Sequence, residues 1–374
     1  MNSRRLRIGV DGRAFGSPAG GVRRYVSELY GAIAHVEPDV DVVAVGAPDG
    51  VELPPRVSRH AATAFPTNLG WTALSLPLAV RGAGLDVFHA PAYTAPLWGV
   101  HPQALTIHDV SYERKPEWNA YRNDSFRRAF YRRSAIAADR VITDSEFSQR
   151  EITAAYGIPP DRIAVVPLAA SAVFIPGAFD AALAPADVAP PYALHVGDLH
   201  VRRNLRTALD AILALRRERA GRGITLPRLV CVGIDRGIGA ELRAAASGDP
   251  GALVLTGVVP EAALVNLYRG AFLLVYPSLY EGFGLPALEA MQCGTPVAIA
   301  NAGSLPEVAA GAAVVLDPQN VRAWRDAIVA VWQDPAMRAR LGNAGLARAS
   351  AFTWTRTAAQ TLEILRRLAT EPSR

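Results

Sequence analysis

Two carboxylates separated by a glycine-rich turn are the residues whose types and spacing point most directly to chemistry. Glu281 precedes the turn, and Glu289 lies about one turn into the helix predicted after it. Pro286 suits the first turn of that helix, and Gly294 suits the position just past its end. Free N–H groups at a helix start favour an anion, while carboxylates accept hydrogen bonds from hydroxyl groups. Together they fit a nucleotide diphosphate sugar; two solvated glutamates at an ordinary turn are the alternative.

Two arginines follow another predicted strand. Gly197 ends that strand, Arg202 and Arg203 come next, and Asn204 is expected to cap the helix after them. Guanidinium groups match the oxygens of a phosphate group in geometry and charge. Positive charge at a helix start opposes the helix dipole, so a role in ligand binding is favoured over a solvated pair.

A glycine pair opens a helix after the first strand of the chain. The N–H groups at Gly20 and Gly21 again favour an anion, although a simple tight turn would use the same residues. The surrounding sequence is not a G-x-G-x-x-G fingerprint, so no dinucleotide cofactor is expected.

Two histidines lie at the carboxyl ends of predicted strands. His108 directly follows its strand, and His89 ends a neighbouring one. Asp109 either orients His108 or caps the next turn; a histidine at such a place is more often part of the core. No cluster of side chains has the spacing of a zinc site, and the D-x-D letters at 39–41 lie far from the other motifs. No metal is therefore expected.

The segment E-G-F-G-L-P-A-L-E resembles the E-x7-E motif of retaining glycosyltransferases of family 4, which have the GT-B fold. The resemblance implies an α/β protein with two Rossmann-like domains whose parallel sheets face each other across an interdomain cleft. It implies that Glu289 binds the ribose of the donor and that Glu281 lies beside the transferred sugar. The main chain of the turn would contact sugar and phosphate through Gly282, Phe283, Gly284, Leu285 and Pro286.

The same resemblance implies roles for the other motifs. Gly20 and Gly21 would approach the donor phosphate from the amino domain. Gly197 would line the donor site, and Arg202 and Arg203 would neutralise the leaving diphosphate. Catalysis would rest on Glu281 and on three further residues: His108 beside the sugar, Arg202 and Arg203. The acceptor side would be lined by His89 and Asp109.

Two further segments, R-I-G-V-D-G-R and T-I-H-D-V-S, resemble bacterial mannosyl- and rhamnosyltransferases of cell-surface polysaccharide and lipopolysaccharide assembly. GDP-mannose is the first expected donor, and UDP-sugars come next. The expected acceptor is a glycan or a polyprenyl-diphosphate-linked saccharide, with neither cofactor nor metal. A nucleotide-sugar epimerase of the same fold and a non-catalytic nucleotide-sugar binding protein are the alternatives.

Predicted strands and helices alternate in both halves of the chain, which indicates parallel sheets covered by helices. Strands are expected at 6–10, 40–45, 87–89, 104–107, 141–143, 164–166, 193–196, 228–232, 253–256, 271–276, 297–300 and 313–316. Helices are expected at 22–34, 124–138, 147–156, 205–219, 323–332 and 355–368.

This alternation predicts the domain organisation. Residues 1–170 are expected to form a Rossmann-like acceptor domain, and residues 192–354 a Rossmann-like nucleotide-sugar domain. Between them, residues 171–191 hold four prolines without clean periodicity and are predicted to be a linker. The resemblance implies that the helix at 355–374 packs back on the amino-terminal domain.

Composition narrows the functional class further. A chain of 374 residues is long enough for two domains, and its net charge of +5 is too small to indicate nucleic-acid binding. Two cysteines, Cys231 and Cys293, do not make a disulfide framework and suggest a reducing compartment. We find no signal-peptide pattern and no apolar run of membrane-spanning length. A cytoplasmic enzyme is expected, with contact to the inner face of the cell membrane as an option.

That option rests on the segment 121–135, where arginines and phenylalanines recur at helical spacing. It is read either as a solvated face over a core face or, less favoured, as a contact with an anionic membrane. By contrast, Ser304 and Glu307 resemble active-site residues but are interpreted as the capping box of a helix.

Overall fold

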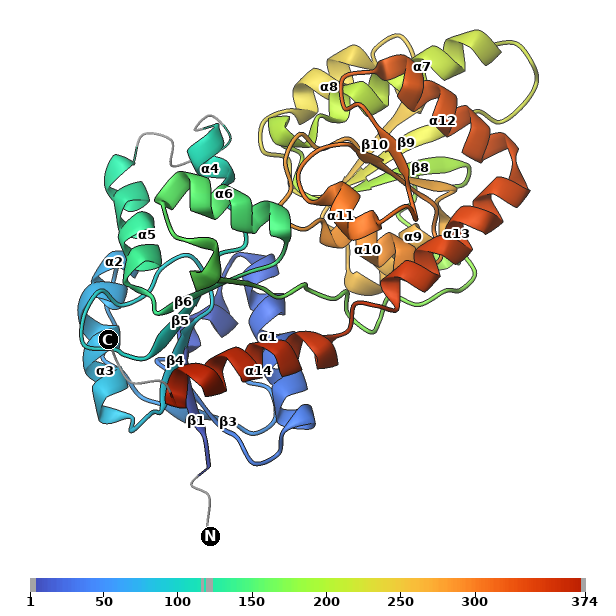
Figure 1. The fold of residues 1–374 in the computed structure, drawn as a ribbon. Helices are drawn as coiled ribbons and strands as arrows, with labels where there is room; N and C mark the ends of the chain where they lie inside the picture. Colours follow the sequence, from blue (N-terminus) through green and yellow to red (C-terminus); the bar gives the residue numbers. More distant parts are fainter. Residues whose placement is uncertain (1–4, 116–117, 119–123, 371–374) are drawn as a thin grey trace. The chain divides into compact units, whose positions relative to one another are not determined.

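The computed structural model describes residues 5–115, 118 and 124–370, and it divides into two α/β units (Figure 1). The first unit draws on the ranges Met1–Leu168 and Thr353–Arg374, and the second is Ala169–Phe352. The chain therefore enters the second unit once and returns to the first for its last helix.

The first unit is built on a seven-stranded parallel sheet in the order β3-β2-β1-β4-β5-β6-β7. Its central strands are apolar and buried on both faces, as parallel strands covered by helices are. The strands are β1 (Arg7–Asp11), β2 (Asp41–Val45), β3 (Val57–His60), β4 (Val87–Ala90), β5 (Gln103–Thr106), β6 (Arg140–Thr143) and β7 (Ile163–Val165).

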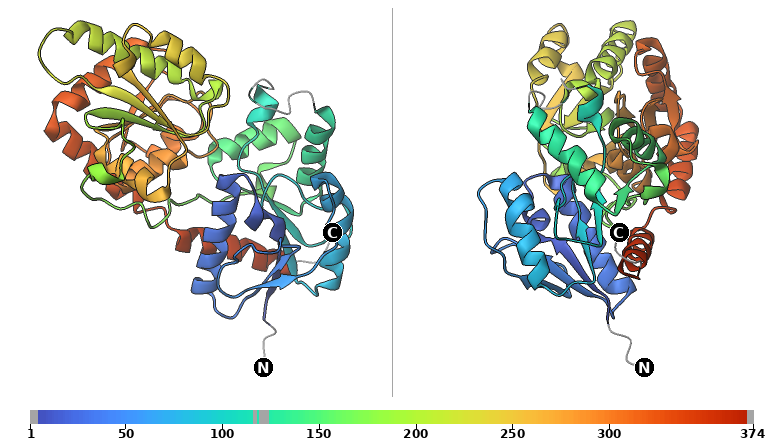
Figure 2. Two further views of the ribbon diagram at one scale, coloured as in Figure 1. Left: turned by 180° about the vertical axis from the view of Figure 1, so that it is seen from behind. Right: turned by 60° about the vertical axis from the view of Figure 1, so that its left-hand side comes forward.

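Helices cover both faces of this sheet, and the last helix of the chain packs beside the first (Figure 2). The hydroxyl of Thr357 donates to the carbonyl of Pro167 at 2.7 Å, and Arg366 pairs with Glu37 at 2.6 Å. The helices are α1 (Gly20–Val36), α2 (Asn68–Gly70), α3 (Leu76–Gly82), α4 (Ser111–Arg114), α5 (Ser125–Ala137), α6 (Glu146–Tyr156) and α14 (Trp354–Thr370). A π-helical turn, Trp71–Ser75, joins α2 to α3.

The second unit repeats the plan with six parallel strands in the order β10-β9-β8-β11-β12-β13. The strands are β8 (Tyr192–Val196), β9 (Arg228–Val232), β10 (Leu253–Gly257), β11 (Leu273–Tyr276), β12 (Val297–Ala300) and β13 (Val314–Leu316). The helices are α7 (Leu205–Arg219), α8 (Gly239–Ala245), α9 (Glu261–Gly270), α10 (Leu285–Gln292), α11 (Leu305–Ala309), α12 (Val321–Gln333) and α13 (Pro335–Ala349).

The segment predicted as a linker packs on the second unit. Phe174 is fully buried, and its ring lies edge-on to Tyr268 with centroids 5.6 Å apart. The side chain of Asn266 accepts from the N–H of Asp180 at 2.7 Å and donates to its carbonyl at 2.7 Å. Residues 169–191 are thus fastened to the body of the second unit.

In both sheets the order in which the chain adds strands reverses between two central strands. In the first unit this switch point lies between β1 and β4, and in the second between β8 and β11. At such a switch point the loops after the two neighbouring strands run in opposite directions and leave a crevice. Ligands of open α/β sheets bind in this crevice, beyond the carboxyl ends of the strands.

Candidate functional site

Beside the switch point of the second unit, glycines directly follow β8 and β9. Gly197 has a φ of +131° and Gly233 a φ of +146°, which side chains rarely allow. A Cβ atom on Gly233 would lie 2.1 Å from the carbonyl oxygen of Gly197. The loops after the two strands therefore touch through their main chains.

Arg202 and Arg203 lie in the loop after β8, on a single 3₁₀ turn. His200 caps this turn, because its Nδ1 accepts from the N–H of Arg202 at 3.2 Å. Asn204 occupies the position before α7 but does not cap it as expected: its φ of +53° is left-handed, and its side chain bonds no N–H of the helix. Instead its amide donates to the carbonyls of Pro277 at 3.2 Å and Pro318 at 2.7 Å, which ties three loops together.

Glu281 lies between the two arginines and is only 6% exposed. Its carboxylate forms an ion pair with Arg203 and lies 3.5 Å from Nη1 of Arg202. Nη1 of Arg202 also donates to the carbonyl of Tyr280 at 2.7 Å. The sequence thus correctly groups these residues at one edge, but the structure adds that Glu281 is the resident counter-ion of both arginines.

The main chain at Glu281 is held by residues after β12. The hydroxyl and the N–H of Ser304 both lie 3.1 Å from the carbonyl oxygen of Glu281 as donors. A Cβ atom on Gly303 would come within 2.7 Å of the Glu281 main chain. The predicted capping box of Ser304 and Glu307 is therefore wrong, because the Ser304 hydroxyl supports the site instead of capping α11.

The helix after the glycine-rich turn begins as predicted. Gly284 has a left-handed φ of +99°, and α10 starts at Leu285, followed by Pro286. No side chain caps this start, and the N–H groups of Gly284 and Leu285 have no partner among the described residues. The start of α10, at Gly284 and Leu285, thus presents main-chain donors.

Glu289 lies inside α10 and is 5% exposed. The hydroxyl of Tyr268 donates to its Oε2 at 2.7 Å. Burial, and then the charge of Glu289, raise the pKa of Tyr268 well above its usual range, so the phenol keeps its proton and stays a donor. The sequence patterns did not identify Tyr268, which lies on α9 and meets Glu289 only through tertiary packing.

The sequence patterns also did not identify Tyr276, the last residue of β11. Its hydroxyl accepts from Nη1 of Arg203 at 2.5 Å, and the guanidinium carbon lies 5.4 Å from the ring centroid. His195 of β8 stacks on the same ring, with centroids 5.3 Å apart. The position of Tyr276 at the end of a switch-point strand was the available signal.

In the first unit, His108 pairs with a residue that the sequence patterns did not single out. Its Nδ1 lies 2.8 Å from the carboxylate of Asp144, which directly follows β6 and is 2% exposed. The rings of Tyr25 and Tyr93 lie edge-on to His108, with centroids at 4.8 and 6.1 Å. Burial disfavours the charged ring, but the Asp144 carboxylate outweighs it and raises the pKa of His108.

The prediction that His89 lines the acceptor side needs correction. His89 is fully buried, and both ring nitrogens are bonded, to Tyr30 at 2.7 Å and to Thr106 at 2.8 Å. Its burial lowers its pKa to about 3, so it is a neutral core residue with no atom left for an acceptor. Of the two roles considered for Asp109, the structure shows the cap: its Oδ1 accepts from Ser111 at the start of α4.

The glycine pair opens α1 as predicted, since the helix begins at Gly20. A Cβ atom placed on Gly20 or Gly21 would meet nothing within 4 Å, and no side chain caps this helix. The main chain there is accessible. Within the described ranges, no group of three or more His, Cys, Asp or Glu side chains could hold a metal ion, and no helix is long and apolar enough to cross a membrane.

Two family models match the chain in succession. Glycosyltransferase Family 4 covers residues 19–170, and Glycosyl transferases group 1 covers residues 190–334. The O-antigen chain mannosyltransferase B of Escherichia coli is 33% identical over 288 residues, 74% of this chain and 73% of that protein. A D-inositol 3-phosphate glycosyltransferase of Pseudarthrobacter chlorophenolicus is 28% identical over 380 residues, 92% and 90% of the two chains.

Solved structures show the same architecture. Sucrose-phosphate synthase from Thermosynechococcus elongatus superposes with a TM-score of 0.74 at 23% identity, covering 97% of this chain and 99% of that one. WaaG, a glycosyltransferase involved in lipopolysaccharide biosynthesis, gives 0.68 at 16% identity, covering 96% and 99%. The fold is GT-B, with two Rossmann-like domains built on parallel sheets. Fold, motifs and relatives agree that this chain is a glycosyltransferase and belongs to glycosyltransferase family 4.

Proposed function

We propose that this glycosyltransferase moves a hexose, with retention of configuration, from a nucleotide diphosphate sugar to a glycan or a polyprenyl-diphosphate-linked saccharide. The observation that carries the proposal is the pairing of Arg202 and Arg203 with Glu281 at the switch point of the second unit. GDP-mannose is the proposed donor, because the Escherichia coli relative is named a mannosyltransferase of the O-antigen chain. Assembly of a cell-surface polysaccharide is the proposed setting.

The arginines supply the charge stabilisation. As the glycosidic bond breaks, negative charge grows on the leaving diphosphate, and contacts that strengthen at that moment lower the barrier. Arg202 and Arg203 are held in place before the donor arrives, and the N–H groups of Gly284 and Leu285 add main-chain donors. Glu289 would accept hydrogen bonds from the ribose.

The amino-terminal unit would supply the acceptor side. His108, paired with Asp144, would lie beside the transferred sugar, and Gly20 and Gly21 would approach the donor phosphate. As the family resemblance implies, the acceptor hydroxyl would attack on the face that the diphosphate leaves, and a phosphate oxygen would take its proton. No residue of the chain then has to serve as nucleophile.

Metal independence belongs to the same proposal, since the arginines would carry the charge that a metal ion carries in other glycosyltransferases. The test is release of GDP from GDP-mannose in the presence of a polyprenyl-diphosphate-linked saccharide, with and without EDTA. We expect acceptor-dependent release that survives EDTA. Loss of activity in EDTA and its recovery with magnesium or manganese would contradict this part of the proposal.

The same assay separates the alternatives. An epimerase converts its nucleotide sugar without an acceptor, and a binding protein releases no nucleotide at all. Appearance of free GDP only when acceptor is added, together with an α-linked product, supports retaining transfer. UDP- and dTDP-sugars tested in parallel decide the donor base.

Contact with an anionic membrane at the inner face of the cell is proposed for α5, where a lipid-linked acceptor would be met. Of the four arginines on α5, Arg127 pairs with Asp124 and Arg128 with Glu113, so their charges are largely balanced. Arg132 and Arg133 are exposed and have no acidic partner in the described part of the chain. Residues 121–123 of the predicted stripe lie outside the described residues.

A further inference from the structure

Tyr276 is the last residue of β11, and its side chain contacts Arg203. It is fully buried, at the strand that lies next to β8 across the switch point. Its hydroxyl oxygen accepts from Nη1 of Arg203 at 2.5 Å, and the guanidinium carbon lies 5.4 Å from the centroid of its ring. Tyr276 therefore contacts Arg203 through both its hydroxyl and its ring.

The ring of Tyr276 is itself fixed. His195 stacks on it at 5.3 Å with an angle of 18° between the planes. Burial, and then the charge of Arg203, lower the pKa of His195 to about 3, so the imidazole is neutral and does not repel the guanidinium. His195, Tyr276 and Arg203 thus contact one another in succession from the core to the site.

Two side chains of different kinds, those of Glu281 and Tyr276, contact the guanidinium of Arg203. Glu281 is an anion, and it competes for the guanidinium with any diphosphate that binds there. Tyr276 is an uncharged acceptor and has no such conflict. Nε of Arg203 is buried without a partner among the described residues, so the orientation of the side chain depends on these two contacts at Nη1.

We propose that Tyr276 is a positioning residue that keeps Arg203 aimed at the departing diphosphate while Glu281 shares the guanidinium with that anion. This inference rests on the proposed function. Because Arg203 would act most strongly as the glycosidic bond breaks, its loss of alignment should lower kcat more than it raises the KM for the donor.

The test is Tyr276→Phe, which keeps the buried ring and removes only the hydroxyl. We expect kcat for the nucleotide sugar that supports turnover to fall about tenfold or more, with a smaller change in KM. Tyr192→Phe is the matched control, because its buried hydroxyl also makes one hydrogen bond, to the carbonyl of Leu267 at 2.7 Å, away from the arginines. Equal losses of kcat in the two variants would overturn the inference.

A double-mutant cycle tests whether Tyr276 acts through Arg203. If it does, Tyr276→Phe combined with Arg203→Ala should be no slower than Arg203→Ala alone. Multiplying losses would overturn the inference while leaving the role of Arg203 intact. An Arg203→Ala enzyme with normal turnover would overturn both that role and this inference. Thermal unfolding of all variants, read beside Tyr192→Phe, shows whether a loss of activity is a loss of folded protein.

Discussion

His108 owes its electrostatic state to a carboxylate from the neighbouring strand. Asp144 follows β6, His108 follows β5, and these strands lie side by side in the sheet. Because the carboxyl ends of parallel strands meet at one edge, the pair forms without any closeness in sequence. The nearby Asp109 adds a smaller effect of the same sign on the pKa of His108.

We therefore predict that Asp144→Asn lowers the pKa of His108 clearly below its wild-type value. Titration of the imidazole signals by NMR measures this directly. The control is Asp139→Asn, which removes the partner of the exposed His101, 3.0 Å away, and should leave His108 unchanged. A pKa of His108 that does not move in Asp144→Asn would show that burial and other groups set its charge.

The same pair has a consequence for stability. A histidine whose folded pKa is raised contributes stability that is fully present below the unfolded pKa of 6.5 and is lost as pH rises through the folded pKa. The stability advantage of the wild type over Asp144→Asn should therefore shrink as pH rises above 6.5. Urea unfolding at fixed pH values gives that difference.

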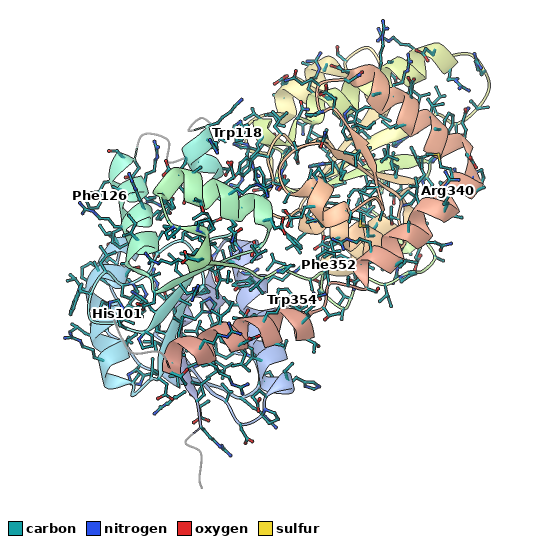
Figure 3. All side chains as sticks on the ribbon, viewed as in Figure 1. His101, Trp118, Phe126, Arg340, Phe352 and Trp354 are labelled. Carbon is teal, nitrogen blue, oxygen red and sulfur yellow. The ribbon has the colours of Figure 1, made fainter. Side chains whose placement is uncertain are left out.

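At the scale of elements, α5 carries two exposed arginines, Arg132 and Arg133, that no acidic side chain of the described residues balances. It is capped by Asp124, whose Oδ1 accepts from the N–H of Arg127 at 2.8 Å. Phe130 packs in the core, whereas Phe126 is 64% exposed and points away from its unit (Figure 3). The aromatic stripe predicted from spacing is thus divided between core and surface.

We predict that Arg132→Gln with Arg133→Gln weakens binding to anionic vesicles about 30-fold, since each basic residue near such a surface contributes ~1 kcal/mol. Arg127→Gln with Arg128→Gln is the matched control, because those arginines are already paired, and it should have a smaller effect. Co-sedimentation at low and high salt is the measurement. Binding that ignores lipid charge would leave α5 as a solvated helix face.

Elements with strong local signals were predictable. The buried strands and the start of α10 follow from apolar runs and from the placement of Gly284, Pro286 and Gly294. Edge strand β3, with two exposed residues, has no such run, and α13 is rich in alanine and arginine and lacks a clear apolar period. Neither was predicted.

Within the site, the sequence located the residues better than their partners. Arg202, Arg203 and Glu281 were expected together because all lie beyond the carboxyl ends of strands. The left-handed Asn204 and the bond from Ser304 to the carbonyl of Glu281 depend on loops far apart in the chain. Such contacts are set by tertiary packing, which local spacing does not encode.

At the scale of the whole molecule, each unit buries one neutral histidine. His89 in the first and His195 in the second are fully buried, and burial lowers the pKa of each to about 3. The unfolded chain binds protons at these positions below pH 6.5, but the folded one does so only near pH 3. Their contribution to stability is therefore present above pH 6.5 and lost as pH falls.

We predict that the free energy of unfolding falls by ~1 kcal/mol per buried histidine between pH 7.5 and 5.5, with His108 opposing part of the loss. Urea unfolding curves at both pH values measure it. His195→Gln should flatten the dependence of the second unit. A stability that is flat over this range would contradict the neutral assignment of the two histidines.

The central claim is that the second unit holds a nucleoside diphosphate through Glu289, with Glu281 acting on the transferred sugar. Isothermal titration of the tightest binder among GDP, UDP and dTDP tests it most directly. We expect Glu289→Ala to weaken binding about 10- to 100-fold. Glu281→Ala should reduce turnover more than it changes binding, and Glu241→Ala, at an exposed glutamate of the same unit, should change neither. Unchanged affinity in Glu289→Ala would contradict the account.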